Sequence, residues 1–175
     1  GGQLLSDYTL DGLNRAISWV PQEPFLFSAS IAENIALAKA GASRAEVEQA
    51  ARLASIHDDI VRMPQGYDTP VGEKGIALSG GQRQRVAIAR AAGFAKKLII
   101  LDEPTAALGV AETARVEQII KGLKERGVPL IIISHNLRQV FDLVDRIWVF
   151  RQGRIICSRL TRETSPEEIV GLITG

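Results

Sequence analysis

Two adjacent carboxylates end an apolar run in the sequence, an arrangement that buried strands normally avoid. In "LIILDEP" (98–104), Asp102 and Glu103 directly follow four aliphatic residues. An ionised carboxylate is costly away from water unless a cation or a donor compensates it, and carboxylate oxygens suit a hard cation. The motif predicts a bound cation and a polarised water molecule, and the alternative is that Asp102 only caps the segment that follows.

A second candidate is the glycine turn in "LSGGQRQRVAIARA" (78–91), which precedes a helical pattern. A turn at a helix start presents unpaired backbone N–H groups and the positive end of the helix dipole, and Ser79 adds a hydroxyl. These groups suit an anion such as a phosphate. A third candidate is "LIIISHN" (130–136), where Ser134 and His135 follow an apolar run, although a lone histidine there is more often structural than catalytic.

The elements that must position these residues follow an α/β pattern. Strand-like runs alternate with helical patterns, and the runs at 97–102 and 129–134 are apolar on both faces, which is typical of parallel strands buried between helices. A further strand is expected at 16–20, and Trp19 and Trp148 are expected to be core residues. Ligands bind at the carboxyl ends of such strands.

The remaining patterns predict helices, a loop and a hairpin. They are a helix opened by the capping-box spacing of Ser43 and Glu46 and continuing to Ile60, a loop at 63–75, a helix at 111–126 ending at Gly127, a hairpin of 147–150 and 154–158 around Gln152-Gly153, and a last helix from Ser165.

Composition narrows the function classes. Lys and Arg number 21 against 20 Asp and Glu, so the formal net charge of +1 provides no global attraction for nucleic acid or anionic lipid. The apolar runs are far shorter than the roughly 20 residues of a membrane-spanning helix. The one cysteine, Cys157, forms no internal disulfide. One domain is the economical interpretation.

Four motifs together resemble the ATP-binding cassette (ABC) family. They are a Q-loop in "VPQEPFLF" (20–27), the signature "LSGGQ" (78–82), a Walker B strand in "LIILDE" (98–103) and a switch histidine in "ISHN" (133–136). They occur in the family's order, and the resemblance covers essentially all of the chain. It implies a P-loop NTPase core with a mainly parallel sheet, a helical subdomain inserted between Q-loop and signature, and a C-terminal β-hairpin and helix.

The resemblance also implies roles for the motif residues. Residues 1–175 would form one partial ABC ATPase domain, with the helical subdomain and its loop at about 28–75 and the signature, Walker B and switch region at 76–175. Gln22 would serve the Mg²⁺ and attacking-water site, Asp102 would hold Mg²⁺, Glu103 would orient or deprotonate the water, and His135 would contact the γ-phosphate.

The signature implies a partner. In the family, Ser79, Gly80 and Gly81, with Gln82 closing the motif, bind the γ-phosphate of ATP held by the opposite subunit. The implied partners are therefore a second nucleotide-binding domain and a transmembrane transporter domain at the cytoplasmic face of the membrane, with ATP and Mg²⁺ as cofactors and no nucleic acid. "FLF" (25–27) is either core or a surface that docks the membrane subunit.

One family motif is absent. No G-x-x-x-x-G-K-[S/T] occurs in the 175 residues, and "GGQLLSDYTLDGLN" (1–14) resembles the stretch just after that phosphate loop. We expect the domain to be N-terminally truncated. By family analogy the lost strand lies between those at 130–134 and 147–150, leaving both with unpaired edges, and the chain by itself is expected to have negligible ATPase activity.

Two branches of the family are represented. Residues 17–75 resemble exporter ATPases, including Glu73 in a loop that touches an exporter's membrane domain, whereas the sequence from about Gly93 resembles sugar-importer ATPases. Pro104 stands where exporters usually have Ala, and Gly109 replaces the usual D-loop Asp. Two alternatives stay open: a non-hydrolysing half that lends its signature to a complete partner, and a cassette ATPase acting on DNA or ribosomes.

Overall fold

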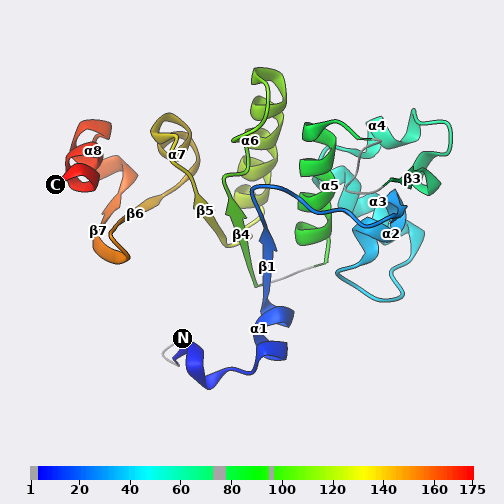
Figure 1. Ribbon diagram of the computed structural model, residues 1–175, viewed down its shortest axis with the longest axis horizontal. Coiled ribbons are helices and arrows are strands. Elements are labelled where there is room, and N and C mark those ends of the chain that lie inside the picture. The colour runs from blue at the N-terminus through cyan, green and yellow to red at the C-terminus, as the bar shows by residue number, and fades with distance from the viewer. Residues whose placement is uncertain (1–3, 73–77, 95–96) are drawn as a thin grey trace. The chain divides into compact units, whose positions relative to one another are not determined.

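The computed structural model describes residues 4–72, 78–94 and 97–175. The chain divides into two compact units, Gly1–Ile133 and Ser134–Gly175 (Figure 1). The first unit contains η1 (Leu5–Asp7), α1 (Leu10–Ala16), β1 (Ile17–Val20), β2 (Ala29–Ser30), α2 (Ile31–Ala36), α3 (Arg44–Leu53), α4 (His57–Val61), η2 (Gly66–Asp68), β3 (Pro70–Val71), α5 (Gly80–Ala92), β4 (Leu98–Asp102), α6 (Val110–Glu125) and β5 (Leu130–Ile133). The second contains α7 (Leu137–Leu143), β6 (Arg146–Arg151), β7 (Arg154–Leu160), η4 (Thr161–Glu163) and α8 (Pro166–Thr174).

A parallel sheet of order β1-β4-β5 forms the centre of the first unit, and the α/β fold expected from the sequence is confirmed. β4 lies in the middle, with Val20 opposite Leu101 on one side and Ile133 opposite Asp102 on the other. Because the three strands are parallel and in this register, their carboxyl ends meet at one edge of the sheet. The residues that follow β1 and β4 are thereby brought to a common edge.

The two faces of this sheet differ in burial. Val20, Ile99 and Leu101 are buried, and α5 packs against β1. Trp19, on the alternate face, is 62% exposed, so the prediction that it is a core residue was wrong. Trp148 on β6 is 56% exposed for the same reason, since side chains alternate between the faces of a strand.

Short, tightly capped helices fill the region between β1 and α5. Ser30 caps α2 and Ser43 caps α3, each with a full capping box. The helix predicted to run to Ile60 breaks at Ser55, whose φ is +50°, and resumes as α4. The predicted loop contains η2 and the strand β3, which pairs with β2, and its residues 73–75 lie outside the described residues.

The second unit is a hairpin packed against two helices. β6 and β7 pair antiparallel, and the turn has Gln152 at φ +49° and Gly153 at φ +74°, as the sequence predicted. Its core contains Val140, Ile147, Val149 and Ile169. In neither unit does the described part of the chain contain a helix long and apolar enough to cross a membrane.

The α3 cap predicts an acid-dependent stability. A hydrogen bond from Lys39, followed by bonds from the Ser43 backbone and hydroxyl, lowers the pKa of Glu46 from 4.5 to about 2. A lowered folded-state pKa contributes stability that is present above the unfolded-state pKa and is lost as the pH falls toward the folded value. Glu46→Gln should therefore flatten the loss of stability between about pH 4.5 and 2, measured as urea midpoints by circular dichroism.

Glu125→Gln, which neutralises an exposed carboxylate in the last turn of α6, is the matched control. An acid limb equally steep in Glu46→Gln and in the unaltered chain would contradict this assignment.

Candidate functional site

The signature turn forms the N-terminus of α5, and a capping box between Ser79 and Gln82 fixes its conformation. Ser79 is the N-cap of α5, its hydroxyl oxygen accepts from the Gln82 N–H at 3.2 Å, and its N–H donates to Gln82 Oε1 at 2.9 Å. The Ser79 hydroxyl proton stays available for donation. Within the described residues, no hydrogen-bond acceptor meets the N–H groups of Gly80 and Gly81. The turn therefore presents two backbone donors and one hydroxyl at the positive end of α5.

The two glycines are required to different degrees. A Cβ on Gly81 would lie 2.1 Å from Glu112 Oε2, so the carboxylate of α6 occupies the space that any other residue needs. A Cβ on Gly80 would meet only the Leu108 side chain at 3.7 Å and Arg83 at 3.9 Å, which are ordinary contacts. A side chain at position 81 would therefore require the Glu112 side chain to move away from the turn.

The two strand-end carboxylates differ in backbone geometry. Asp102 is the last residue of β4, whereas Glu103 has φ +44°, in the left-handed region. The Glu103 N–H donates to the Ile133 carbonyl at 2.8 Å, and its carbonyl accepts from the Ala106 N–H at 3.1 Å. Left-handed backbone costs a residue with a Cβ about 1–2 kcal/mol, and strain of this kind is concentrated at functional sites.

The structure places Gln22 at the same edge of the sheet. It is exposed and follows the end of β1 by two residues, next to the end of β4 that carries Asp102. His135 lies in the second unit, is exposed, and follows β5 by two residues along the chain. Its neighbour Asn136 caps α7, accepting from the Gln139 N–H at 3.2 Å.

The residues at this edge of the sheet supply only part of a ligand set for Mg²⁺. No group of three or more His, Cys, Asp or Glu side chains gathers within the described ranges to hold a metal. Asp102 and Gln22 supply a carboxylate and an amide oxygen, which are ligands that Mg²⁺ accepts. Because Mg²⁺ keeps several waters and binds phosphate oxygens through one or two protein groups, this donor set suits a metal that arrives with a nucleotide.

Sequence reasoning missed a clamp between α5 and the segment after Gln22. Arg90 donates to the Asn34 carbonyl at 2.9 Å, to the Phe25 carbonyl at 3.2 Å and to Asn34 Oδ1 at 3.3 Å. The fully buried Asn34 also accepts from the Phe27 N–H at 2.8 Å. Burial lowers the pKa of Arg90. The sequence signal that could have predicted this contact was an arginine four residues after Val86 on a buried helix.

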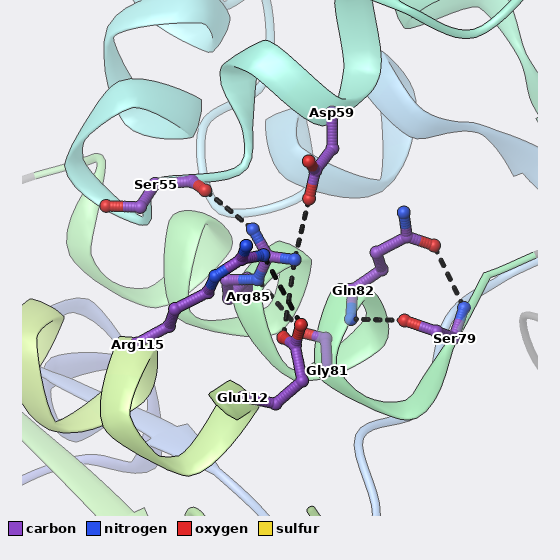
Figure 2. A network of polar contacts seen from close by, with 8 residues as sticks. All are labelled: Ser55, Asp59, Ser79, Gly81, Gln82, Arg85, Glu112 and Arg115. Carbon is purple, nitrogen blue, oxygen red and sulfur yellow. Dashed lines mark hydrogen bonds and ion pairs between the residues drawn. The ribbon is translucent and has the colours of Figure 1, made fainter. Parts of the chain in front are cut away.

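A buried arginine near the signature turn was also missed. Arg85 is 2% exposed and contacts Asp59 of α4 and Glu112 of α6 (Figure 2). An ionisable side chain among the apolar positions of an amphipathic helix indicates a buried partner, but the sequence does not say which carboxylate it is.

Comparisons with known proteins show which family this chain belongs to. The family model described as "ABC transporter" matches residues 1–106. The chain belongs to the ABC transporter family. The multidrug resistance-like ATP-binding protein MdlA of Buchnera aphidicola is 44% identical over 152 residues, which are 87% of this chain and 26% of that protein. MdlA of Escherichia coli is 43% identical, over 86% of this chain and 25% of that protein.

A solved ABC transporter shares the fold. The structure of a bacterial Atm1-family ABC exporter with ATP bound superposes with a TM-score of 0.83 at 40% identity, over 92% of this chain and 28% of that one. The chain thus spans about a quarter of the length of these relatives. The ABC ATPase-like fold expected from the motifs is confirmed. The solved relative is described as an exporter.

The backbone of Glu103 yields a stability prediction. Glu103→Gly and Glu103→Ala remove the same side chain, but only alanine carries the left-handed penalty, so the glycine variant should be the more stable by about 1 kcal/mol. Urea unfolding followed by circular dichroism measures this difference.

Ala106→Gly, in the turn that follows Glu103, serves as the control, because Ala106 is not among the residues with positive φ and glycine there should not stabilise. A Glu103→Ala variant at least as stable as Glu103→Gly would show that the positive φ carries no strain.

Proposed function

We propose that this chain is the signature and Walker B part of a nucleotide-binding domain that couples ATP hydrolysis to transport across a membrane. The observation that carries the proposal is the capped Ser79 turn, in which the N–H groups of Gly80 and Gly81 have no acceptor within the described residues. The turn belongs to the unit that also contains Asp102 and Glu103. Phosphoryl transfer needs mainly positioning and charge neutralisation, which such groups supply. The domain works at the cytoplasmic face of the membrane.

The site residues have distinct roles in this proposal. Asp102 and Gln22 would hold the Mg²⁺ that comes with ATP, and the ion when bound would supply neutralisation of phosphate charge there. Glu103 orients or deprotonates the attacking water, and His135 contacts the γ-phosphate. The strained backbone of Glu103 and the exposed amide of Gln22, both at strand ends, support these roles.

The signature turn acts on ATP held by a second nucleotide-binding domain. Ser79 donates its hydroxyl proton, and Gly80 and Gly81 donate their N–H groups, to the γ-phosphate, while Gln82 holds the turn through the capping box. The phosphate loop of the site comes from outside these 175 residues, since the sequence has no G-x-x-x-x-G-K-[S/T]. Within the described ranges β5 pairs only with β4, and β6 pairs only with β7, so each of the two strands has an edge to which a further strand could add.

The segment after Gln22 docks the transmembrane domain. Phe25 and Phe27 are 52% and 49% exposed and pack edge to face, with ring centroids 4.9 Å apart, whereas Leu26 between them is fully buried. Two half-exposed aromatic rings held by a buried neighbour form an apolar contact surface. Of the two alternatives for "FLF", the exposure of the rings favours docking.

The two halves of the chain resemble ATPases of transporters that work in opposite directions. The exporter relatives support an exporter assembly. We keep the sugar-importer resemblance from about Gly93, with Pro104 and Gly109 as its markers, as part of the proposal. Glu73, the exporter-type contact to the membrane domain, lies outside the described residues.

A second candidate is a half-site that does not hydrolyse ATP and lends its signature to a complete partner. The absence of a phosphate-loop motif beside an intact, capped signature turn favours it. The two candidates differ in whether adding a phosphate loop creates a complete site in this chain.

Calorimetry with MgATP separates the candidates. The test compares this chain with a completed cassette, in which a G-x-x-x-x-G-K-[S/T] segment from an ABC ATPase is joined before residue 1. We expect binding and hydrolysis only in the completed cassette. Hydrolysis by the unextended chain, or a completed cassette that binds MgATP but does not hydrolyse it, would contradict the leading candidate, and the latter result would favour the half-site.

In the completed cassette, Glu103→Gln should lower the rate of hydrolysis by at least about 100-fold, because the water loses its positioned carboxylate. ATP-induced dimerisation, measured by size-exclusion chromatography, should persist. Glu125→Gln, an exposed carboxylate in the last turn of α6, is the control. Turnover of Glu103→Gln at the unaltered rate would remove Glu103 from the catalytic role.

A further inference from the structure

Arg85 uses all three of its guanidinium nitrogens inside the first unit (Figure 2). Nη2 lies 2.6 Å from Asp59 Oδ2 and 3.4 Å from Glu112 Oε2, Nη1 donates to the Ser55 carbonyl at 2.6 Å, and Nε donates to the Gly81 carbonyl at 3.3 Å. One side chain thereby joins α4, α6, the break before α4 and the first turn of α5.

Glu112 lies directly against the signature turn. Its carboxylate fills the space over Gly81 where a Cβ would be, and within the described part of the chain its buried Oε2 has no hydrogen-bond donor. That oxygen depends on the ion pair with Arg85. Arg115 pairs with the other oxygen, Oε1, at 3.3 Å, but its side chain is half exposed.

The location of Glu112 creates an electrostatic conflict. The Ser79 turn presents N–H donors and a helix dipole for an anion, yet a carboxylate stands beside the same turn. An uncompensated negative charge repels a phosphate at short range, especially where water is partly excluded. The guanidinium of Arg85 offsets this charge and also donates to the Gly81 carbonyl, whose peptide unit carries the Gln82 N–H that donates to the Ser79 hydroxyl oxygen.

We propose that Arg85 is a positioning residue that neutralises Glu112 and holds the Ser79–Gly81 turn in its phosphate-binding geometry, with Asp59 anchoring the guanidinium to α4. The proposal rests on the proposed function, because the turn is taken to bind the γ-phosphate of ATP held by a partner domain. It assigns these three side chains a role that acts through the turn, without contact to the nucleotide.

Asp58 provides a matched control for Asp59. The two aspartates are adjacent in the first turn of α4, but Asp58 is exposed, whereas Asp59 contacts Arg85. Asp58→Asn should leave both the turn and hydrolysis unchanged. Asp59→Asn removes the anchor while keeping the shape of the side chain.

The first measurement uses the chain itself and does not depend on nucleotide. Amide hydrogen exchange by NMR at Ser79 and Gln82, whose N–H groups donate within the capping box, should accelerate at least about fivefold in Arg85→Gln and in Asp59→Asn, since the turn loses its anchor. Asp58→Asn should match the unaltered chain. Equal exchange in Asp59→Asn and Asp58→Asn would overturn the anchoring role, even if Arg85→Gln fails to fold.

The second measurement uses the completed cassette. Arg85→Gln should lower kcat about tenfold to a hundredfold, as expected for misplaced catalytic donors, with KM for ATP changed less than about threefold. In the double variant, Glu112→Gln is added to Arg85→Gln, and kcat should recover to at least about a tenth of the unaltered value. Where Arg85→Gln alone lowers kcat only about tenfold, the double variant should recover most of the unaltered kcat.

The outcomes separate the two levels of the proposal. A structural role for Arg85 alone predicts no recovery in the double variant, and this result, or an unchanged kcat in Arg85→Gln, would overturn the neutralising role. An unaltered completed cassette that does not hydrolyse ATP contradicts the proposed function, whereas the exchange rates at Ser79 and Gln82 still decide the role of the ion pairs in holding the turn.

Discussion

The buried guanidinium of Arg85, between Asp59 and Glu112, is the interaction on which the geometry of the first unit depends. A buried ion pair is weak evidence for stability, because desolvation offsets much of the attraction, but losing one partner costs about 3–5 kcal/mol by leaving a buried charge unpaired. The contact therefore specifies one relative placement of α4, α5 and α6. The space over Gly81 is defined by that placement.

Helix α5 makes polar contacts of this kind near both of its ends. Ser79 caps its N-terminus, and Arg85 in its second turn donates back to the Gly81 carbonyl in the first turn. Its last turn contains Arg90, which binds Asn34 and the Phe25 carbonyl. Segments far apart in the sequence are thereby fixed to one rigid element. The segment that carries the exposed rings of Phe25 and Phe27 and the Ser79 turn both contact this helix, which is a physical basis for coupling the proposed docking surface to the proposed nucleotide site.

Much of the fold could be predicted from local chemistry. The apolar runs around Leu101 and Ile132, the Gln152-Gly153 turn and the capping spacings each determine structure over a few residues, so sequence alone places them. The capping box of Ser79 follows the same rule, with Gln82 three residues later. The motifs of the ABC family then identified the candidate site residues, and the family and its fold are confirmed by the comparisons.

What could not be predicted depends on contacts between distant segments. The left-handed Glu103 arises where a strand end meets the Ile133 carbonyl, and Trp19 is exposed because the described helices cover the other face of the sheet. The partners of Arg85 depend on how α4 and α6 pack. Asp59 lies 26 residues before Arg85 in the sequence, and Glu112 lies 27 residues after it. No local pattern encodes such a choice.

The central claim is that the Ser79 turn binds a phosphate held by another domain, and complementation tests it most directly. Gly80→Asp in the completed cassette places a carboxylate at the turn, and its Cβ makes only ordinary contacts with Leu108 and Arg83. The variant's own sites should therefore be inactive while its phosphate loop is intact. The account predicts that adding the unaltered chain, which has a signature and no phosphate-loop motif, restores ATP hydrolysis. Hydrolysis that stays at the level of the Gly80→Asp cassette alone would contradict it.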